Sequence, residues 1–164
     1  MTKSRYDGRE LDSILKLNIG CGNDCPNYFI NVDIREDTPA DIICDVRKLP
    51  FDDGRFQHIE SHDVLEHISH RETYQTLKEW FRVLKKGGTF RFIVPNLLVA
   101  FESIKINDYG TAINIIYGAQ DYPENKHLMG FTPYNIRVIL ETMGLKRVVI
   151  QPQNLHIIVE GIKE

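Results

Sequence analysis

Residues 17–23 read Leu17-Asn18-Ile19-Gly20-Cys21-Gly22-Asn23, and this stretch decides how the rest of the sequence is interpreted. An apolar run, typical of a buried strand, stops at two glycines separated by one residue. A second apolar run follows and stops at Asp33. In an open α/β sheet, ligands bind beyond the carboxyl ends of the strands, where glycines admit a ligand close to the backbone. A carboxylate there accepts hydrogen bonds from ribose hydroxyls, so the stretch predicts a nucleoside-type pocket.

Length and composition predict one domain over residues 1–164, long enough to bury a substantial core. Apolar residues make up 42% of the chain and charged residues 26%, which is ordinary for a soluble globular protein. The formal net charge is −3 and no segment concentrates Lys and Arg, so neither nucleic acid nor a membrane surface is an expected partner. Apolar runs are too short to span a bilayer and the N-terminus is polar, so we expect a cytoplasmic protein.

Three cysteines are present, Cys21, Cys25 and Cys44. Their odd number argues against a disulfide framework. The sequence contains no CxxC pair, so a metal or cluster site is not indicated either. We therefore expect them to serve as small apolar side chains.

The hydrophobic pattern predicts a mostly parallel sheet with helices, of the α/β class. Two glycines, Gly87 and Gly88, are expected to end the longest helix. The final two strands, joined by the polar turn 151–154, are expected to be antiparallel. Expected strands cover 16–20, 28–33, 40–45, 56–63, 89–94, 145–150 and 155–162, and expected helices cover 10–15, 64–68, 71–85, 97–118 with a break near 107–110, and 132–143.

The first two crossovers are too short for a full helix. Parallel neighbours usually need a connection of about a dozen residues or more. One face of the sheet should therefore lack its usual helices, and bare apolar surface rarely stays exposed. We expect either the N-terminal segment and helices 97–118, or a second subunit in a homodimer, to cover that face.

A dinucleotide fingerprint is incomplete. Its third glycine position holds Cys25, and its acidic residue should lie about 20 residues on, whereas Asp33 is much closer. A nicotinamide or flavin pocket is therefore disfavoured.

Further motifs follow in order, each near an expected strand end: Asn31-Val32-Asp33, then Asp45 before Leu49-Pro50-Phe51, then Leu65-Glu66-His67, and Leu84-Lys85-Lys86-Gly87-Gly88. Together with the glycine stretch, this series resembles the class I S-adenosylmethionine-dependent methyltransferases, in particular a small bacterial and phage-like group of type 11/12. The resemblance runs from about Leu17 to the C-terminus. It implies a compact Rossmann-like sheet, mostly parallel with an antiparallel last strand, and S-adenosylmethionine as cofactor.

The resemblance also implies residue roles. The backbone of Gly20, Cys21 and Gly22 would approach the methionine and ribose of the cofactor. Asp33 would hold the ribose hydroxyls, Asp45 the adenine amino group, and the amide of Val46 a ring nitrogen. The methionine end and the acceptor side would be lined by Ser61, His62 and Asp63. The implied cofactor-binding set is completed by Asn18 and Ile34.

Each of these residues also has a plain structural interpretation. Asp33 can cap a loop and Asp45 can form a turn. A metal cluster can be imagined from His62, Glu66, His67 and His70. The spacing lacks an HExxH arrangement, so we expect no metal and a structural or pocket-lining His67.

The acceptor side is expected in the second half, where a loop over 121–131 precedes the helix that starts at Thr132. Imidazole titrates near neutral pH, so His127 is the expected general base, with His62 as a second catalytic candidate. The alternative for His127 is that it only holds the loop in place. Tyr117 and Tyr122 are candidates for lining the acceptor pocket.

These inferences predict an enzyme of the EC 2.1.1 class that methylates an oxygen or nitrogen of a small-molecule or glycan-type acceptor. The alternative is a catalytically inactive methyltransferase-like domain that acts as a binding or assembly module. A nicotinamide oxidoreductase is the third and least favoured hypothesis.

Overall fold

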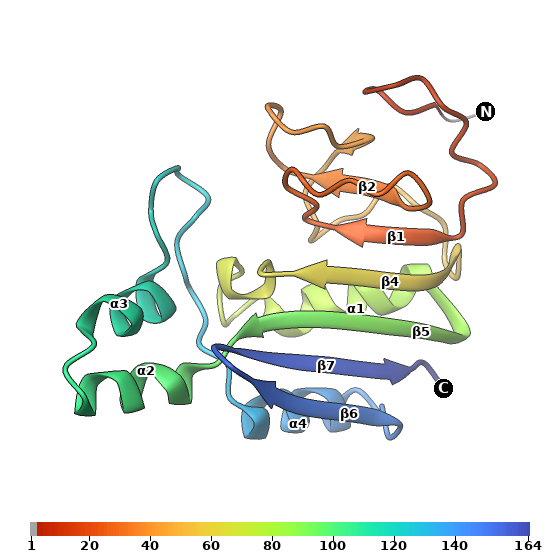
Figure 1. Cartoon of the computed structure of the whole chain (residues 1–164). Helices are drawn as coiled ribbons and strands as arrows, with labels where there is room; N and C mark the ends of the chain where they lie inside the picture. The colour runs from red at the N-terminus through yellow and green to blue at the C-terminus, as the bar shows by residue number, and fades with distance from the viewer. Residues whose placement is uncertain (1–2) are drawn as a thin grey trace.

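The computed structural model describes residues 3–164 and contains a seven-stranded sheet in the order β3-β2-β1-β4-β5-β7-β6 (Figure 1). All neighbouring pairs from β3 to β5 are parallel, and β7 is antiparallel to both of its neighbours. The expected α/β sheet with a reversed last strand is confirmed. The strands are β1 (Lys16–Ile19), β2 (Ile30–Asp33), β3 (Ile42–Ile43), β4 (Phe56–His62), β5 (Leu84–Pro95), β6 (Val148–Gln153) and β7 (His156–Ile162).

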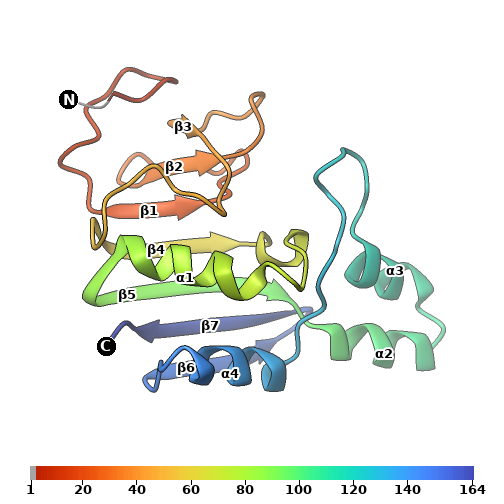
Figure 2. The ribbon, with the colours of Figure 1, turned by 180° about the vertical axis from the view of Figure 1, so that it is seen from behind.

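Two helices, α1 (Thr73–Val83) and α4 (Pro133–Thr142), cover one face of the sheet (Figure 2). Leu77, Trp80 and Phe81 are buried on α1 at helical spacing, and Trp80 is only 1% exposed. They pack with the inward side chains of the strands, such as Phe90 of β5, to form the main core. Burial of this apolar surface fixes the helices on the sheet.

Helix α4 begins as the sequence predicts. The Thr132 hydroxyl accepts a hydrogen bond from the backbone N–H of Asn135, and the Asn135 side chain accepts one from the backbone N–H of Thr132. Pro133 occupies the first turn, where its missing N–H costs nothing. This capping box sets the boundary between the 121–131 loop and the helix.

The opposite face of the sheet carries no helix in either view (Figures 1 and 2). The missing crossover helices are thus confirmed among residues 3–164, because no helix lies between β1 and β2 or between β2 and β3. The expected covering by helices 97–118 is wrong. The register places mainly polar residues on this face, among them Lys16, Asn18, His58, Glu60, Arg91 and Glu160.

Polar pairing explains why this face needs no cover. Arg91 forms an ion pair with Glu160 at 3.0 Å, and the His58 ring lies 2.7 Å from the hydroxyl of Thr89. The central strands alternate apolar and polar residues, a pattern that suits one solvated face. The apolar surface that motivated the expected homodimer is therefore absent from these strands, and the dimer stays a prediction.

Helices α2 (Leu97–Lys105) and α3 (Tyr109–Tyr117) extend beyond the carboxyl ends of the strands and pack mainly against each other (Figure 1). The expected break near 107–110 is confirmed. Ala100, Ala112 and Ile115 form their small shared core. Several large apolar side chains of this pair stay exposed: Leu98, Phe101, Ile104, Tyr109, Ile113 and Tyr117. No helix among residues 3–164 is long and apolar enough to cross a membrane.

Several local predictions are wrong. Residues 10–15 form no helix; Lys3 and Glu10 instead make an isolated antiparallel bridge. Gly87 and Gly88 do not end α1, which stops at Val83, but lie inside β5. The pairing of β5 with β4 is interrupted there, between Leu84 and Thr89, and Gly87 has a φ of 75°, so the two glycines form a bulge inside the strand. The expected 151–154 turn is also misplaced, because β6 runs through Gln153 and the chain turns at Asn154, whose φ is 52°.

Candidate active site

A cleft of about 750 Å³ opens at the carboxyl ends of β1, β2, β3 and β4. This is the edge of an open α/β sheet at which ligands bind. The cleft brings together most of the cofactor-binding residues that the sequence predicts. Those that line it are Asn18, Gly20, Cys21, Gly22, Asp33, Ile34, Asp45, Val46, His62 and Asp63.

Gly20 and Gly22 form a tight turn after β1, with φ of 67° and 53°. This left-handed region suits glycine because it has no Cβ. A Cβ on Gly20 would lie 2.3 Å from Cγ2 of Val64, so the turn is also too close to the exit of β4 for any side chain. The cradle therefore depends on glycine for both its backbone shape and its space.

Asp33 connects this turn to the end of β2. Its Oδ2 accepts a hydrogen bond from the backbone N–H of Gly22 at 2.8 Å, and its Oδ1 accepts one from the backbone N–H of Arg35 at 2.9 Å. The residue is only 6% exposed. Each carboxylate oxygen can accept more than one hydrogen bond, so Asp33 retains acceptor sites facing the cleft.

Asp45 lies at the far side of the cleft, after β3. Arg47 holds its carboxylate with contacts of 2.7–3.0 Å from the guanidinium, and Arg47 also pairs with Glu72 at 3.0 Å. The hydrogen bonds from Arg47 lower the pKa of Asp45, which is therefore an ionised acceptor near neutral pH. An ionised carboxylate at this position fits the amino group of an adenine.

The backbone of the neighbouring Val46 is held in place by a buried side chain of the core. The indole N–H of the buried Trp80 donates to the carbonyl oxygen of Val46 at 3.0 Å. The interpretation of Trp80 as a core residue, rather than part of an aromatic cage, is confirmed by its 1% exposure. The contact aligns the backbone that follows Asp45.

Of the three residues at the end of β4 that were expected to line the cofactor, His62 and Asp63 line the cleft and Ser61 does not. His62 is exposed and lines the cleft, and Asp63 adopts a φ of 50° beside it. Ser61 does not line the cleft: it pairs with Phe92 on the core side of the sheet. Its hydroxyl is buried without a hydrogen-bond partner among residues 3–164.

The 121–131 loop returns to the cleft and supplies part of its lining. The guanidinium of Arg35 lies 4.6 Å from the centre of the Tyr122 ring, a cation–π contact. The backbone carbonyl of Glu66 accepts hydrogen bonds from the N–H groups of Leu128 and Met129. The loop is therefore anchored on both sides of the cleft.

His127 does not reach the cleft itself. It lines a neighbouring cavity of about 330 Å³, which shares Asp63, His67 and Tyr122 with the cleft. The His127 ring packs beside Gly118, where a Cβ would lie 2.9 Å from its Cδ2. Its Nδ1 lies 2.8 Å from the carbonyl oxygen of Ile115. The residue predicted as general base is thus held in place beside the cleft, in the neighbouring cavity.

Sequence reasoning missed Arg35, Arg47 and Glu72, which all line the cleft. Arg35 and Arg47 each stand two residues after a predicted site carboxylate, and this spacing was the available signal. Glu72 carried none, because only the fold brings it to Arg47.

The cysteines are free thiols. Cys21 is buried, and burial raises its pKa far above the ordinary range. Burial also raises the pKa of Cys44 to about 11. These thiols are protonated near neutral pH, in agreement with their expected role as small apolar side chains.

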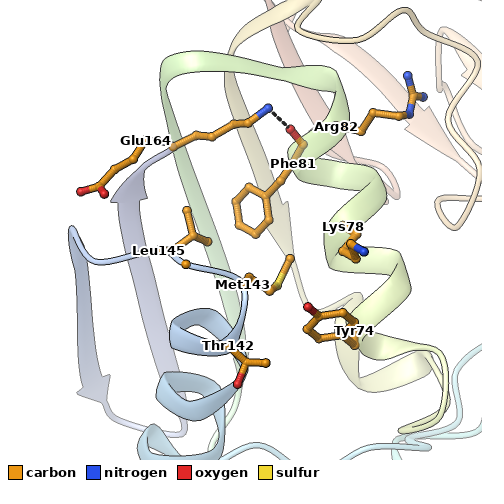
Figure 3. A pocket seen from close by; sticks show the side chains of 10 residues that line it. Tyr74, Lys78, Phe81, Arg82, Thr142, Met143, Leu145 and Glu164 are labelled. Carbon is orange, nitrogen blue, oxygen red and sulfur yellow. Dashed lines mark hydrogen bonds between the residues drawn. The ribbon is translucent and has the colours of Figure 1, made fainter.

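A further cavity, of about 360 Å³, lies between α1 and the end of α4 (Figure 3). Tyr74, Phe81 and Met143 supply much of its wall. The amine of Lys163 donates to the carbonyl oxygens of Phe81 and Leu84, which ties the C-terminal segment to α1. None of the predicted site residues lines this cavity.

Known structures share this fold. A protein of Pyrococcus horikoshii OT3 superposes with a TM-score of 0.62 at 19% identity, covering 91% of this chain and 81% of that one. A Thermotoga maritima protein is described as a SAM-dependent methyltransferase and possible histamine N-methyltransferase. It superposes with a TM-score of 0.63 at 15% identity, covering 91% of this chain and 82% of that one. A SAM-dependent methyltransferase of Archaeoglobus fulgidus superposes with a TM-score of 0.63 at 16% sequence identity, covering 90% of this chain and 85% of that one.

In sequence, residues 21–92 match the family model described as a methyltransferase domain. The resemblance to the class I methyltransferases is confirmed. The matched segment runs from the glycine turn to the middle of β5 and contains Asp33, Asp45 and the end of β4. No curated protein is significantly similar to the chain in sequence. The match is to a methyltransferase domain in general, over less than half of the chain, and it names no acceptor.

Proposed function

We propose that this methyltransferase transfers the methyl group of S-adenosylmethionine to an oxygen or nitrogen of a small-molecule or glycan-type acceptor. The observation that carries the proposal is the cleft itself. Asp33 and Asp45 follow successive parallel strands, and both line this cleft. Carboxylates placed in this way suit ribose hydroxyls at one end and an adenine amino group at the other. The donor set therefore fits the cofactor.

The cofactor supplies an electrophilic methyl on a sulfonium, with a neutral leaving group. The protein's own contribution is to align the acceptor with that methyl and to exclude water. The glycine turn brings backbone close to the cofactor, and the 121–131 loop with Tyr122 closes the side toward the neighbouring cavity. That cavity, with its histidines, is the proposed acceptor site.

Proton removal is the second requirement for a hydroxyl acceptor. His62 lines the cleft and lies 3.4 Å from Asp63, and His127 lines the acceptor cavity. Either imidazole is chemically suited to take the proton. An amine or carboxylate acceptor would need only positioning.

The test is release of S-adenosylhomocysteine from S-adenosylmethionine in the presence of a panel of sugars, phenols, amines and carboxylic acids. We expect release with at least one acceptor class and none with boiled protein. Formation of a methylated product, measured by mass spectrometry, identifies the acceptor atom. Binding of the cofactor without turnover on any acceptor would contradict the enzymatic proposal.

One observation favours a second candidate, a non-catalytic binding or assembly module. Helices α2 and α3 expose several large apolar side chains, including Phe101 at 50% and Ile113 at 54%. Contiguous exposed apolar surface commonly marks a protein-interaction site. Cofactor binding without methyl transfer, together with a partner bound through α2 and α3, would favour this alternative.

A further inference from the structure

Three potential metal ligands converge on the acceptor cavity from two distant parts of the chain. Glu66 and His67 belong to the short helix η1 (Leu65–His67), and His127 belongs to the loop after α3. One carboxylate oxygen of Glu66 and one ring nitrogen of each histidine all lie within 4.8 Å of one another. Ligands bound to one ion at about 2.1 Å lie roughly 3 Å apart, so small side-chain rotations would bring these atoms to one ion.

Both imidazoles have a fixed hydrogen-bonding arrangement. Nδ1 of His67 lies 3.0 Å from the carbonyl oxygen of Lys126, and Nδ1 of His127 lies 2.8 Å from that of Ile115. A carbonyl oxygen can only accept, so each Nδ1 carries the hydrogen. In the neutral ring Nε2 then has a free lone pair. Donation from the other ring nitrogen to a carbonyl is how proteins usually orient a metal-binding histidine.

The two rings face each other at a centroid distance of 5.1 Å and an interplanar angle of 68°. Gly118 leaves the space in which the His127 ring sits, because a Cβ there would clash with the ring. The pair is thus held in place rather than free to rotate into solvent.

Glu66 is the independent sign that a ligand belongs here. The residue is 1% exposed, and neither carboxylate oxygen has a hydrogen-bond partner among residues 3–164. A buried, unpaired carboxylate is costly unless it is neutralised or coordinates a cation.

We propose that Glu66, His67 and His127 bind one divalent first-row transition-metal ion at the boundary of the cofactor cleft and the acceptor cavity. Two imidazoles and a carboxylate suit Mn²⁺, Fe²⁺, Co²⁺ or Zn²⁺, whereas Mg²⁺ and Ca²⁺ prefer oxygen ligands throughout. Three protein ligands leave coordination positions for other groups. The sequence spacing favoured no metal because only folding brings His127 to the LEH segment.

The site has a consequence for the acceptor, and this step rests on the proposed function. His67 lines both cavities, so an ion on it lies between the cofactor and the acceptor. A metal-bound hydroxyl loses its proton more easily. Its oxygen then forms a bond to the methyl carbon while the carbon–sulfur bond breaks, the electron pair stays on sulfur, and the proton passes to solvent. The acceptor class that this arrangement favours is a hydroxyl with a second oxygen beside it, able to chelate the ion.

The test measures metal binding to the full chain after removal of adventitious metal with a chelator. Zn²⁺ is titrated by calorimetry, and Co²⁺ by its visible absorption, which reports coordination. We expect one ion per chain, and affinity at least tenfold weaker in Glu66→Gln and in His127→Gln. Both variants are close in size to the native residue, and their folding is checked by S-adenosylhomocysteine binding and thermal unfolding in metal-free buffer.

Matched controls address other histidines. His70→Gln and His58→Gln remove histidines outside the cluster and should leave the affinity for Zn²⁺ unchanged. A second group, His62, Asp63 and His156, also lies within ligand reach. Loss of the bound ion in His156→Gln, with full binding in Glu66→Gln and His127→Gln, would overturn the proposal.

The two proposals fail separately. If the chain binds S-adenosylhomocysteine but no stoichiometric Zn²⁺ or Co²⁺, the metal site is wrong and the methyltransferase proposal stands. If it binds the ion but no S-adenosylhomocysteine, the proposed function is wrong and the metal site stands. Metal affinity distinguishes a ligand from a general base at position 127, because His127→Gln weakens Zn²⁺ binding only if the imidazole coordinates the ion; unchanged Zn²⁺ affinity with lost methyl transfer would overturn the ligand role.

Discussion

The backbone N–H of Gly22 donates a hydrogen bond to Oδ2 of Asp33 at 2.8 Å, which joins the turn after β1 to the carboxyl end of β2. In most sheets of this kind a helix separates two such strands. Here a short loop takes its place, and the carboxylate itself holds the glycine turn in position. The contact therefore has two roles, since it stabilises the loop and sets one wall of the cleft that we propose binds the cofactor.

Substitution of Gly20 tests the turn. Gly20→Ala would place Cβ 2.3 Å from Val64 at a φ of 67°, so we expect destabilisation by more than about 2 kcal/mol, from strain and overpacking together. Gly87→Ala is the matched control, because its φ of 75° carries the same backbone strain with nothing within 4 Å. Denaturant unfolding compares the two. Equal losses of stability would mean that Val64 does not restrict the turn.

Removal of the Asp45 carboxylate separates binding from stability. Asp45 and Arg47 are partly exposed, with side chains 37% and 45% accessible, so Asp45→Ala should change the free energy of unfolding by less than about 1 kcal/mol. Affinity for S-adenosylhomocysteine should fall at least tenfold, measured by calorimetry. Arg47→Ala leaves the carboxylate in place and should weaken binding less. The opposite order would assign the adenine contact to Arg47.

The support of Val46 from the core can be tested at Trp80. Trp80→Phe removes the indole N–H and leaves the carbonyl of Val46 without its buried donor. We expect a loss of about 1–3 kcal/mol in the free energy of unfolding. Affinity for S-adenosylhomocysteine, measured on the folded variant, should fall as well. Unchanged stability would show that water replaces the indole donor.

Thiol chemistry follows from burial of Cys44. With the pKa raised from 9.0 to about 11, alkylation by iodoacetamide at pH 8 should be about 100-fold slower than in the unfolded chain. The rate should rise about tenfold per pH unit until pH 11, because only the thiolate reacts. Mass spectrometry of the Cys44 peptide gives the rate. Alkylation as fast as in denaturant would contradict the buried thiol.

The central features of the fold could be predicted because they depend on local chemistry. Strand ends at Gly20 and Asp33, and the cap at Thr132, are each set by neighbouring residues. The polar face was missed although its signal was present: Lys16 and Asn18 alternate with the apolar Leu17 and Ile19, which indicates one solvated face.

Other parts of the site could not be predicted, because folding alone creates them. The contact of Arg35 with Tyr122 and that of His67 with His127 both join the first half of the chain to the loop after α3. Neither pair has a sequence spacing that carries meaning. The buried, unpaired state of Glu66 likewise depends on how the loop packs over η1.

The most direct measurement is a calorimetric titration of the folded chain with S-adenosylhomocysteine, alongside Asp33→Ala and the exposed control Asp37→Ala. We predict saturable binding of one molecule per chain, lost in Asp33→Ala and unchanged in Asp37→Ala. Absence of binding by the unmodified chain, to S-adenosylhomocysteine and to S-adenosylmethionine alike, would contradict the assignment of this cleft as a methyltransferase cofactor site.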